Sequence, residues 1–503
     1  MILFRGKEGF LFNFKSKKMQ QLNRKTANKT AIAPERIMQF GGGNFLRAFS
    51  DWMFDVLNKE TDFEGSIVII KPTQRGDYDE LKQQDGLFHV ALDGIRKGEL
   101  VSTVTLVESV SRVIQPYTQW DDYLKLAESP DLRFIISNTT ESGIRFSETD
   151  QLNDNPPHEF PAKVTVWLHH RFQYFKGDHS KGCILMPCEL IENNGEALKK
   201  AIIQYAHHFN LSSDFVAWIE NSNYFCNTLV DRIVSGYPTD RADEILKQIG
   251  YNDPLLVAGE DYHSFVVQGP AIVQKELPFS QTNLNVQFVN DISAYCEMKV
   301  RILNGAHTSL VPVAYLAGLR TVKESMENPN ILQFVNEVLA EEITKTLQNF
   351  PEEELDYFVN AVLDRFKNPT LKHFLISISL NSTSKFMARL YPALKEYTES
   401  QGQLPKRIVF SLSCLIRFYK GEYNNEIIPI NDATETLDFF KMIWSQKDAG
   451  TIGYTELVQK VIGNVAIWGE NLTTIPNLVE TVASNLEALE KNGIEASIKN
   501  LVS

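Results

Sequence analysis

The sequence predicts an α/β domain with a mostly parallel sheet, followed by a mainly α-helical domain. In the first half, short apolar runs alternate with helical patterns, and beyond about residue 290 the pattern is helical almost throughout. Strands that alternate with helices form βαβ units, which build parallel sheets. A chain of 503 residues is long enough for two or three domains. We expect the α/β domain at 31–290, the helical domain at 291–503, and an N-terminal extension or arm at 1–30.

The first-half elements follow from local pattern. The expected strands are short apolar runs, as in a sheet buried on both faces: 36–40, 66–71, 133–138 and 183–188. Longer segments with apolar residues at helical spacing lie between them: 45–60, 117–129 and 195–209. The stretch 99–113 is expected to add strand as a hairpin insertion.

The second half and the N-terminus complete the outline. Segments 330–350 and 478–493 have the clearest helical spacing after residue 290. The first 30 residues are basic and rich in Phe, without a continuous apolar core or a small-residue cleavage site, so no secretory signal is predicted. A start at Met19 would make residues 1–18 an extension outside the fold; an ordered N-terminal arm is the alternative.

Composition excludes several classes of protein. The net charge of −13 argues against nucleic-acid binding, and no apolar run approaches the ~18–20 residues needed to cross a bilayer. The five cysteines contain no CxxC pair, and no zinc-ligand spacing is visible, so no metal is expected. The sparse, odd cysteine count fits a reducing compartment. We expect a cytoplasmic protein that acts on a small molecule.

A glycine loop follows the first expected strand. The strand runs into Gly41-Gly42-Gly43, and a helix follows at once. Glycines let the backbone approach a pyrophosphate closely, and a helix N-terminus offers free N–H groups. The strict GxGxxG pattern is not met, and glycine loops also occur as plain turns. In this strand–loop–helix context we predict a Rossmann-like dinucleotide site formed by Ile37, Met38, Gln39, Phe40, Gly41, Gly42, Gly43, Asn44, Phe45, Leu46, Arg47 and Ala48.

The residues after the second strand bear on the choice of cofactor. An NAD-binding unit usually carries an acid there for the ribose 2′-hydroxyl. This chain instead has Lys71, with Arg75 shortly after it. On these residues alone NADP stays open, because either cation could meet a 2′-phosphate; the alternative is that both are solvated loop charges.

Two further segments place polar residues near the expected crevice. Asn138, Thr140 and Glu141 follow the third strand, where ligands of open α/β sheets bind; the alternative is a helix N-cap box. In NTLVDRIV (227–234), Asp231 and Arg232 stand among apolar residues. They form either a structural ion pair or a site carboxylate near the cofactor.

The segment KVRILNGAHT (299–308) carries the candidate catalytic group. On a regular helix Lys299 and His307 lie roughly 80° apart, with Asn304 roughly 60° beyond His307. Interconverting a ketone and a secondary alcohol needs a proton partner, here Lys299, and donors aimed at the reacting oxygen, here Asn304 and His307. The alternative is a lysine reaching solvent and a satisfied core histidine.

These three residues match the K-x4-N-x2-H signature of the polyol-specific long-chain dehydrogenases, the mannitol dehydrogenase family. The glycine loop, NTTESGI, NTLVDRI and the block 365–386 also resemble family segments, so the likeness runs from about residue 20 to the end. The resemblance implies hydride transfer with NAD and without metal. It also implies that Lys299 is the general acid/base, and that Asn227, Asp231 and Lys385 contact the substrate.

Departures from the family pattern point to a particular substrate class. Cys188-Glu189-Leu190 replaces the family's C-D-N, and Ser377 stands where polyol enzymes carry an arginine. The chain looks most like the family members that reduce a keto-uronate to an aldonate. Fructuronate reduction and mannitol oxidation are the alternatives within the family. An epimerase that retains NAD and a sugar-acid sensor are alternatives from other classes, and the intact catalytic trio argues against the sensor.

Overall fold

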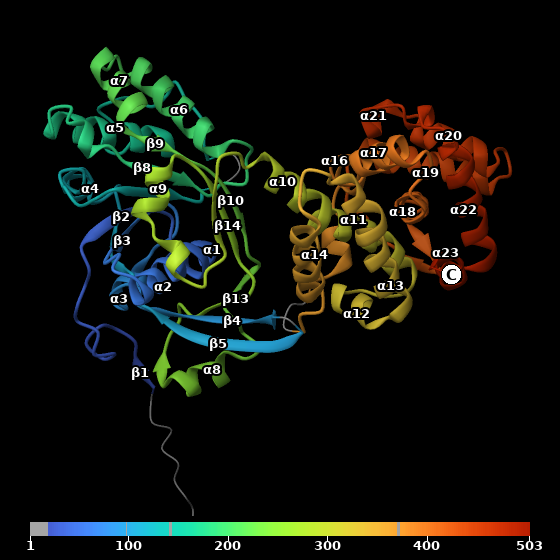
Figure 1. Ribbon diagram of the computed structural model, residues 1–503, viewed down its shortest axis with the longest axis horizontal. Helices are drawn as coiled ribbons and strands as arrows, with labels where there is room; N and C mark the ends of the chain where they lie inside the picture. Colours follow the sequence, from blue (N-terminus) through green and yellow to red (C-terminus); the bar gives the residue numbers. More distant parts are fainter. Residues whose placement is uncertain (1–18, 97, 140–142, 370–372, 503) are drawn as a thin grey trace, which may run out of the picture.

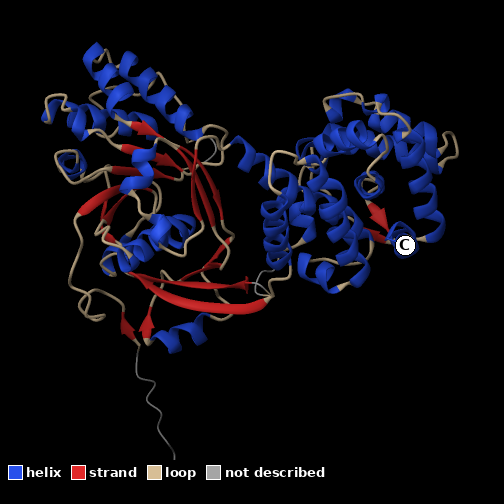
Figure 2. Ribbon diagram, viewed as in Figure 1, coloured by secondary structure: helices blue, strands red, loops and turns tan. Residues whose placement is uncertain are grey.

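The computed structural model describes residues 19–96, 98–139, 143–369 and 373–502. An α/β domain and a helical domain lie side by side, and α10 (Ser293–Lys299) leads from the first into the second (Figure 1). Strands are concentrated in the first domain (Figure 2). None of the described helices is long and apolar enough to cross a membrane. The predicted fold class is confirmed.

A six-stranded parallel sheet forms the centre of the first domain. Its order is β6-β3-β2-β7-β8-β9, and all neighbouring strands are parallel. The four strands expected from apolar runs are all present. Their bounds and those of the outer strands are β2 Glu35–Phe40, β3 Ser66–Ile70, β6 Val110–Ile114, β7 Phe134–Ser137, β8 Ile184–Pro187 and β9 Tyr224–Phe225.

Helices cover both faces of this sheet. Ile37 packs into the core on one face and Met38 and Phe40 into the core on the other, because successive strand residues point to opposite faces. The first helix begins right after the glycine loop and contains a π-helical turn. The helices of this domain are α1 Asn44–Leu46, the π turn Arg47–Asp51, α2 Trp52–Glu60, α3 Asp79–Gln83, α4 Trp120–Leu126, α5 Phe160–Tyr174, α6 Asn194–His208, α7 Ser213–Ser222, α8 Ala242–Ile249 and α9 Ala271–Glu276.

Two smaller sheets extend the domain. One has the order β11-β13-β4-β5 and includes the antiparallel hairpin of β4 and β5, so the expected hairpin is confirmed. The stretch 99–113 does not form one strand, because β6 leaves the hairpin and joins the central sheet. The other sheet has the order β10-β14-β15. Their bounds are β4 Phe88–Arg96, β5 Glu99–Val107, β10 Asn227–Asp231, β11 Val234–Gly236, β13 Val257–Glu260, β14 Ser264–Gln268 and β15 Val286–Val289.

The described part of the N-terminus is an ordered arm. β1 (Gln20–Gln21) pairs with β12 (Tyr251–Asn252) in parallel. The buried Arg24 donates hydrogen bonds to the carbonyl oxygens of Val110, at 2.7 Å, and Glu108, at 3.0 Å. These contacts fix residues 19–30 to the α/β domain. The predicted extension at residues 1–18 lies outside the described residues.

The helical domain surrounds α11 (Gly305–Leu316) and α18 (Lys406–Phe418), which are buried on nearly every side. A helix that is apolar all round belongs inside a domain. The other helices are α12 Val322–Glu327, α13 Pro329–Glu337, α14 Glu352–Phe366, α15 Leu375–Ile378, α16 Ser382–Arg389, α17 Tyr391–Gln401, α19 Thr434–Asp448, α20 Tyr454–Ile462, α21 Val465–Trp468, α22 Leu478–Asn492 and α23 Ile494–Val502. A small hairpin of β16 (Glu422–Tyr423) and β17 (Glu426–Ile427) joins them.

Candidate active site

The glycine loop has a separate requirement at each position. Gly41 has a φ of +111°, which L side chains rarely adopt, and its N–H bonds the carbonyl of Ile70 at 3.0 Å. Gly42 donates to the hydroxyl of Tyr78 at 2.9 Å, and a Cβ there would press on that ring at 3.1 Å. A Cβ at Gly43 would meet nothing within 4 Å. With the N–H groups of the first helical turn lacking intrahelical partners, the open face beside Gly43 fits a pyrophosphate.

Several of the predicted cofactor residues cannot present their side chains to a ligand. Gln39 is buried and donates its amide to the carbonyl of Gly41 at 3.0 Å. Arg47 is buried and donates to the carbonyl of Leu255 and, at 2.7 Å, to Asn44 Oδ1. The prediction of cofactor contacts is therefore corrected for the side chains that pack in the core. These are Ile37, Met38, Phe40, Leu46 and Ala48. Gly42, Gly43, Asn44 and Phe45 remain the candidates from this segment.

A crevice lies beyond the carboxyl ends of the central strands. Its volume is about 360 Å³, and it is lined by residues from the first helix, the ends of β7, β8 and β10, and α10. Ligands of open α/β sheets bind at this position. Of the predicted residues, Thr140 and Glu141 lie outside the described ones. The lining consists of Phe45, Asn138, Thr139, Glu189, Leu190, Val230, Asp231, Arg232 and Lys299.

The wall after β7 is held by a buried carboxylate that the sequence did not single out as a site residue. Glu189 accepts hydrogen bonds from Ser137 Oγ at 3.0 Å and from both the N–H and the Oγ1 of Thr139 at 2.9 Å. Asn138 donates its amide to the carbonyl of Cys188 at 2.7 Å. Glu189, in the segment Cys188-Glu189-Leu190 that differs from the family pattern, therefore fixes the backbone of this wall.

Lys299 reaches from the helical domain into the crevice. It is the last residue of α10, its side chain is 17% exposed, and its Nζ lies 3.1 Å from the carbonyl of Val230. Asp231 Oδ1 is 3.8 Å from the same nitrogen. These contacts with β10 hold the ammonium group at the boundary of the two domains.

Asp231 forms its main ion pair with a residue far along the chain. Arg365 donates to both carboxylate oxygens of Asp231, at 2.8 and 3.0 Å, and to both of Glu260, at 3.0 and 2.8 Å. Burial raises the pKa of Asp231, but the positive charges of Arg365 and then Lys299 lower it by more, so the pKa lies below its usual value. Two cations thus face two carboxylates beneath the crevice. The guanidinium group of Arg365 is therefore already neutralised by two carboxylates of the protein.

The expected pairing of Asp231 with Arg232 is wrong. Neighbouring residues of a strand point to opposite faces. Arg232 accordingly turns away, donates to the carbonyls of Ala48 and Tyr262, and covers the ring of Trp52 at 4.2 Å. Asp231 is therefore both a crevice residue and part of an ion pair, with a different partner from the one expected.

Replacing Arg365 with Met is expected to lower the free energy of unfolding by about 3–5 kcal/mol, because two buried carboxylates would lose their partner. Denaturant unfolding followed by circular dichroism measures the change. Arg96→Met is the matched control, since the Arg96–Asp261 pair has an arginine side chain 64% exposed and such pairs contribute about 0–1 kcal/mol. Equal losses in the two variants would contradict a central role for Arg365.

The helix that carries the candidate trio is not regular. Val300–Asn304 is π-helical, between α10 and α11. A π turn hydrogen-bonds i to i+5, so it brings Asn304 closer to the face of Lys299 than the roughly 140° of a regular helix. Gly305 is close-packed, since a Cβ there would lie 3.4 Å from Ile343 and Leu390. The expectation of a regular helix is corrected; π turns often occur at functional sites.

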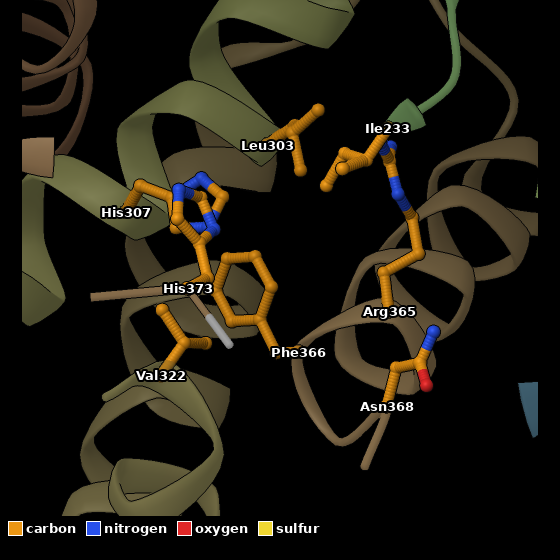
Figure 3. A pocket seen from close by; sticks show the side chains of 8 residues that line it. All are labelled: Ile233, Leu303, His307, Val322, Arg365, Phe366, Asn368 and His373. Carbon is orange, nitrogen blue, oxygen red and sulfur yellow. The ribbon is translucent and has the colours of Figure 1, made fainter. Parts of the chain in front are cut away.

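His307 lies in a second, narrower cavity of about 10 Å³, roughly the space of one water. Its ring packs against Phe366, at 4.2 Å between centroids, and against His373, at 5.1 Å (Figure 3). Burial, with His373 and nearby cations, holds the pKa of His307 well below its usual value, so the imidazole is neutral. Its Nε2 has no hydrogen-bond partner among the described residues. A satisfied core histidine would have one, and this atom is free to meet a ligand oxygen.

The structure does not gather all the predicted residues in one cavity. Lys299 lines the larger crevice, and His307 lines the narrower cavity. Asn304 lies between these two residues in the sequence, and its side chain is half-buried. Asn227 lines neither cavity, and its Oδ1 accepts hydrogen bonds from the N–H groups of Gly195 and Glu196 at the start of α6. Lys385, on α16, donates to the carbonyl of Ile378 at 2.8 Å and lines neither cavity.

The loop after β3 contains the cations that could bind the 2′-phosphate of NADP. Lys71 is buried and donates to the carbonyls of Thr73, at 2.7 Å, and Gln74, at 3.0 Å. Its ammonium group therefore stabilises its own loop, which leaves Arg75 as the exposed cation there.

Metal ions in proteins are usually bound by His, Cys, Asp and Glu side chains. Among the described residues, no group of three such side chains could hold a metal ion.

Gly43→Val is expected to raise the dissociation constant of NADH by about a hundredfold, close to 2.7 kcal/mol. The protein has room for the new side chain, so the clash would be with the pyrophosphate alone. Fluorescence titration with NADH measures the effect, and Gly453→Val, at another glycine with nothing within 4 Å of its Cβ, is the control. Normal NADH binding by a folded Gly43→Val variant would place the pyrophosphate elsewhere.

Comparisons with known proteins agree with this geometry. A family model described as the mannitol dehydrogenase Rossmann domain matches residues 35–281, and one described as the mannitol dehydrogenase C-terminal domain matches residues 291–490. Altronate oxidoreductase of Bacillus subtilis (strain 168) is 45% identical over 481 residues, which cover 96% of this chain and 98% of that protein. Altronate oxidoreductase of Escherichia coli O7:K1 (strain IAI39 / ExPEC) is 44% identical over 484 residues, covering 96% and 100%.

Two solved structures share the fold. Mannitol 2-dehydrogenase of Pseudomonas fluorescens, in a ternary complex with NAD and D-mannitol, has a TM-score of 0.67 at 21% identity and covers 96% of this chain and 99% of its own. Substrate-free D-sorbitol dehydrogenase has a TM-score of 0.76 at 20% identity, with coverage of 95% and 100%.

Proposed function

Because this chain belongs to the mannitol dehydrogenase family and is an NAD-dependent oxidoreductase, we propose that it interconverts D-tagaturonate and D-altronate. The observation that carries the proposal is the crevice in which the ammonium of Lys299 and the helix after the glycine loop line the same space. The altronate oxidoreductases that match nearly the whole chain support the choice of substrate.

Lys299 is the proposed proton donor in the reductive direction. When bound, NAD supplies the hydride chemistry. The ketone oxygen gains negative charge as it is reduced, and a nearby ammonium group stabilises that charge and delivers a proton. In the other direction the amine accepts the proton from the alcohol. Its contacts with Val230 and Asp231 keep the nitrogen in the crevice in both directions.

Asn304 and His307 are the proposed donors to the substrate oxygens. A neutral imidazole offers one N–H and one acceptor nitrogen, and the unpartnered Nε2 of His307 is suited to the donor role. Asn304 stands between His307 and Lys299 in the chain, at the end of the π turn. We propose that the substrate lies along this helix, with its ketone end at Lys299.

Asp231 acts through Lys299 in this proposal and not as a proton carrier. Its lowered pKa keeps it ionised, and Arg365 fixes its two oxygens. It is therefore a positioning residue that holds a negative charge 3.8 Å from the ammonium group.

The test is NADH consumption by the purified enzyme with D-tagaturonate, with the product identified by chromatography against D-altronate and D-mannonate. Production of D-altronate at a higher kcat/KM than any other keto-uronate supports the proposal. Preferential reduction of D-fructuronate to D-mannonate would replace the substrate and leave the chemistry intact.

A further inference from the structure

Two cations on α16 lack acidic partners within the described chain. Lys385 and Arg389 are four residues apart and so share a face of the helix. Arg389 donates to Thr308 Oγ1 at 3.2 Å, and Lys385 to a main-chain carbonyl, and neither forms an ion pair with a described residue. Both are half-buried, and burial lowers the pKa of both groups.

Arg389 is an exception in its domain. Each of the other arginines between residues 293 and 502 forms an ion pair: Arg301 with Glu297 and Glu396, Arg320 with Glu426, Arg365 with Asp231 and Glu260, Arg407 with Glu337, and Arg417 with Glu490. Asp432, whose charge raises the pKa of Lys385 against the effect of burial, accepts hydrogen bonds from Tyr419 and Thr383. Like charges four residues apart repel each other on a helix, although the position of Arg389 in the last turn of α16 is one that favours a cation.

The guanidinium group of Arg389 is hydrogen-bonded to the helix that carries Asn304 and His307. Thr308, which accepts its hydrogen bond, follows His307 directly and donates to the carbonyl of Asn304 at 2.8 Å. Arg389 and Lys385 are among the charges that lower the pKa of His307, after burial and other neighbours. The main-chain oxygen of Arg389 would lie 3.6 Å from a Cβ at Gly305. The unpaired positive charge thus lies beyond Asn304 and His307, at the end away from Lys299.

We propose that Arg389 binds the carboxylate of the substrate and sets the preference for a sugar acid over a neutral sugar. This inference rests on the proposed function. With the ketone at Lys299, the far end of an open-chain keto-uronate extends along the helix toward Thr308. Arginine presents a planar set of donors that matches both oxygens of a carboxylate. Ser377 on α15 is exposed and offers no charge.

The test compares Arg389→Gln with wild type on D-tagaturonate and on D-tagatose, which carries a hydroxymethyl group in place of the carboxylate. The expected result is a fall in kcat/KM for D-tagaturonate of about 10²–10³-fold, mostly as a higher KM, because a charge-assisted bidentate contact is lost. Activity with D-tagatose and affinity for NADH should stay within a few-fold of wild type. Arg389→Lys should recover part of the loss.

Arg320→Gln is the matched control, because it removes a paired surface arginine of the same domain, and it should leave both substrates unaffected. A purely structural role for Arg389 would lower the melting temperature, kcat and NADH affinity together. Equal losses on D-tagaturonate and D-tagatose would overturn the inference.

Calorimetric binding of D-altronate and of neutral D-altritol separates this inference from the proposed function. If wild type reduces no keto-uronate but binds D-altronate with an affinity that Arg389→Gln abolishes, the anion site stands and the proposed function fails. If wild type reduces D-tagaturonate and the variant binds D-altronate as tightly as wild type, the function stands and the anion site fails.

Discussion

Replacing Lys299 with Ala is expected to lower kcat for keto-uronate reduction by about 10²–10⁴-fold, the usual contribution of a positioned general acid. The variant loses the only ammonium group among the described residues that line the crevice. Asp231 keeps Arg365 as its partner, so the fold should survive. Steady-state kinetics at saturating substrate measures the change.

Two controls separate a chemical role from a structural one. NADH affinity and melting temperature of Lys299→Ala should stay close to wild type, and Lys323→Ala, at a surface lysine paired with Glu327, should keep full activity. The pH profile of kcat/KM for Lys299→Ala should also lose the fall in rate at high pH that deprotonation of Lys299 causes in the wild type. Near-normal turnover in Lys299→Ala would remove the lysine from the chemistry.

A second large effect is expected from the substrate. A neutral ketose would leave the cations of α16 without a counter-charge, and an unpaired buried or half-buried charge commonly costs 2–5 kcal/mol in a complex. At about 1.4 kcal/mol per tenfold change, the corresponding ratio of kcat/KM is about 10²–10³ in favour of the keto-uronate. This ratio does not depend on which keto-uronate stereoisomer is preferred.

The central sheet and the glycine loop were predictable because their signals are local. Strands buried on both faces have continuous apolar runs, and the loop is marked by three glycines between a strand and a helix. Local signals did not show which strand side chains face the core. Ile37 and Met38 point to opposite sides of the sheet, and both are buried because helices cover both faces.

The charge cluster beneath the crevice was not predictable as a unit. Asp231 and Arg365 are 134 residues apart, and Glu260 lies on a third segment. Sequence could mark Asp231 as unusual in an apolar stretch, but strand alternation directs its neighbour Arg232 to another face. The family resemblance implies that Asn227 contacts the substrate, and the structure adds that its amide oxygen accepts hydrogen bonds from the first turn of α6.

The π turn in the catalytic helix shows another limit of sequence periodicity. A wheel of 100° per residue assumes i to i+4 bonding, and the close packing at Gly305 against Ile343 and Leu390 accompanies a different register over Val300–Asn304. On a regular helical wheel, Lys299, Asn304 and His307 lie on one broad side of the helix. The structure adds that Lys299 and His307 line separate cavities along that side.

The most direct test of this account is the ratio of kcat/KM for NADH-dependent reduction of D-tagaturonate and of D-tagatose by the wild-type enzyme, measured at one pH and salt concentration. A keto-uronate reductase with an anion site on α16 predicts a ratio of about 10²–10³ or more. Comparable rates with the two substrates, or a preference for the neutral ketose, would contradict the account and make the enzyme a polyol dehydrogenase.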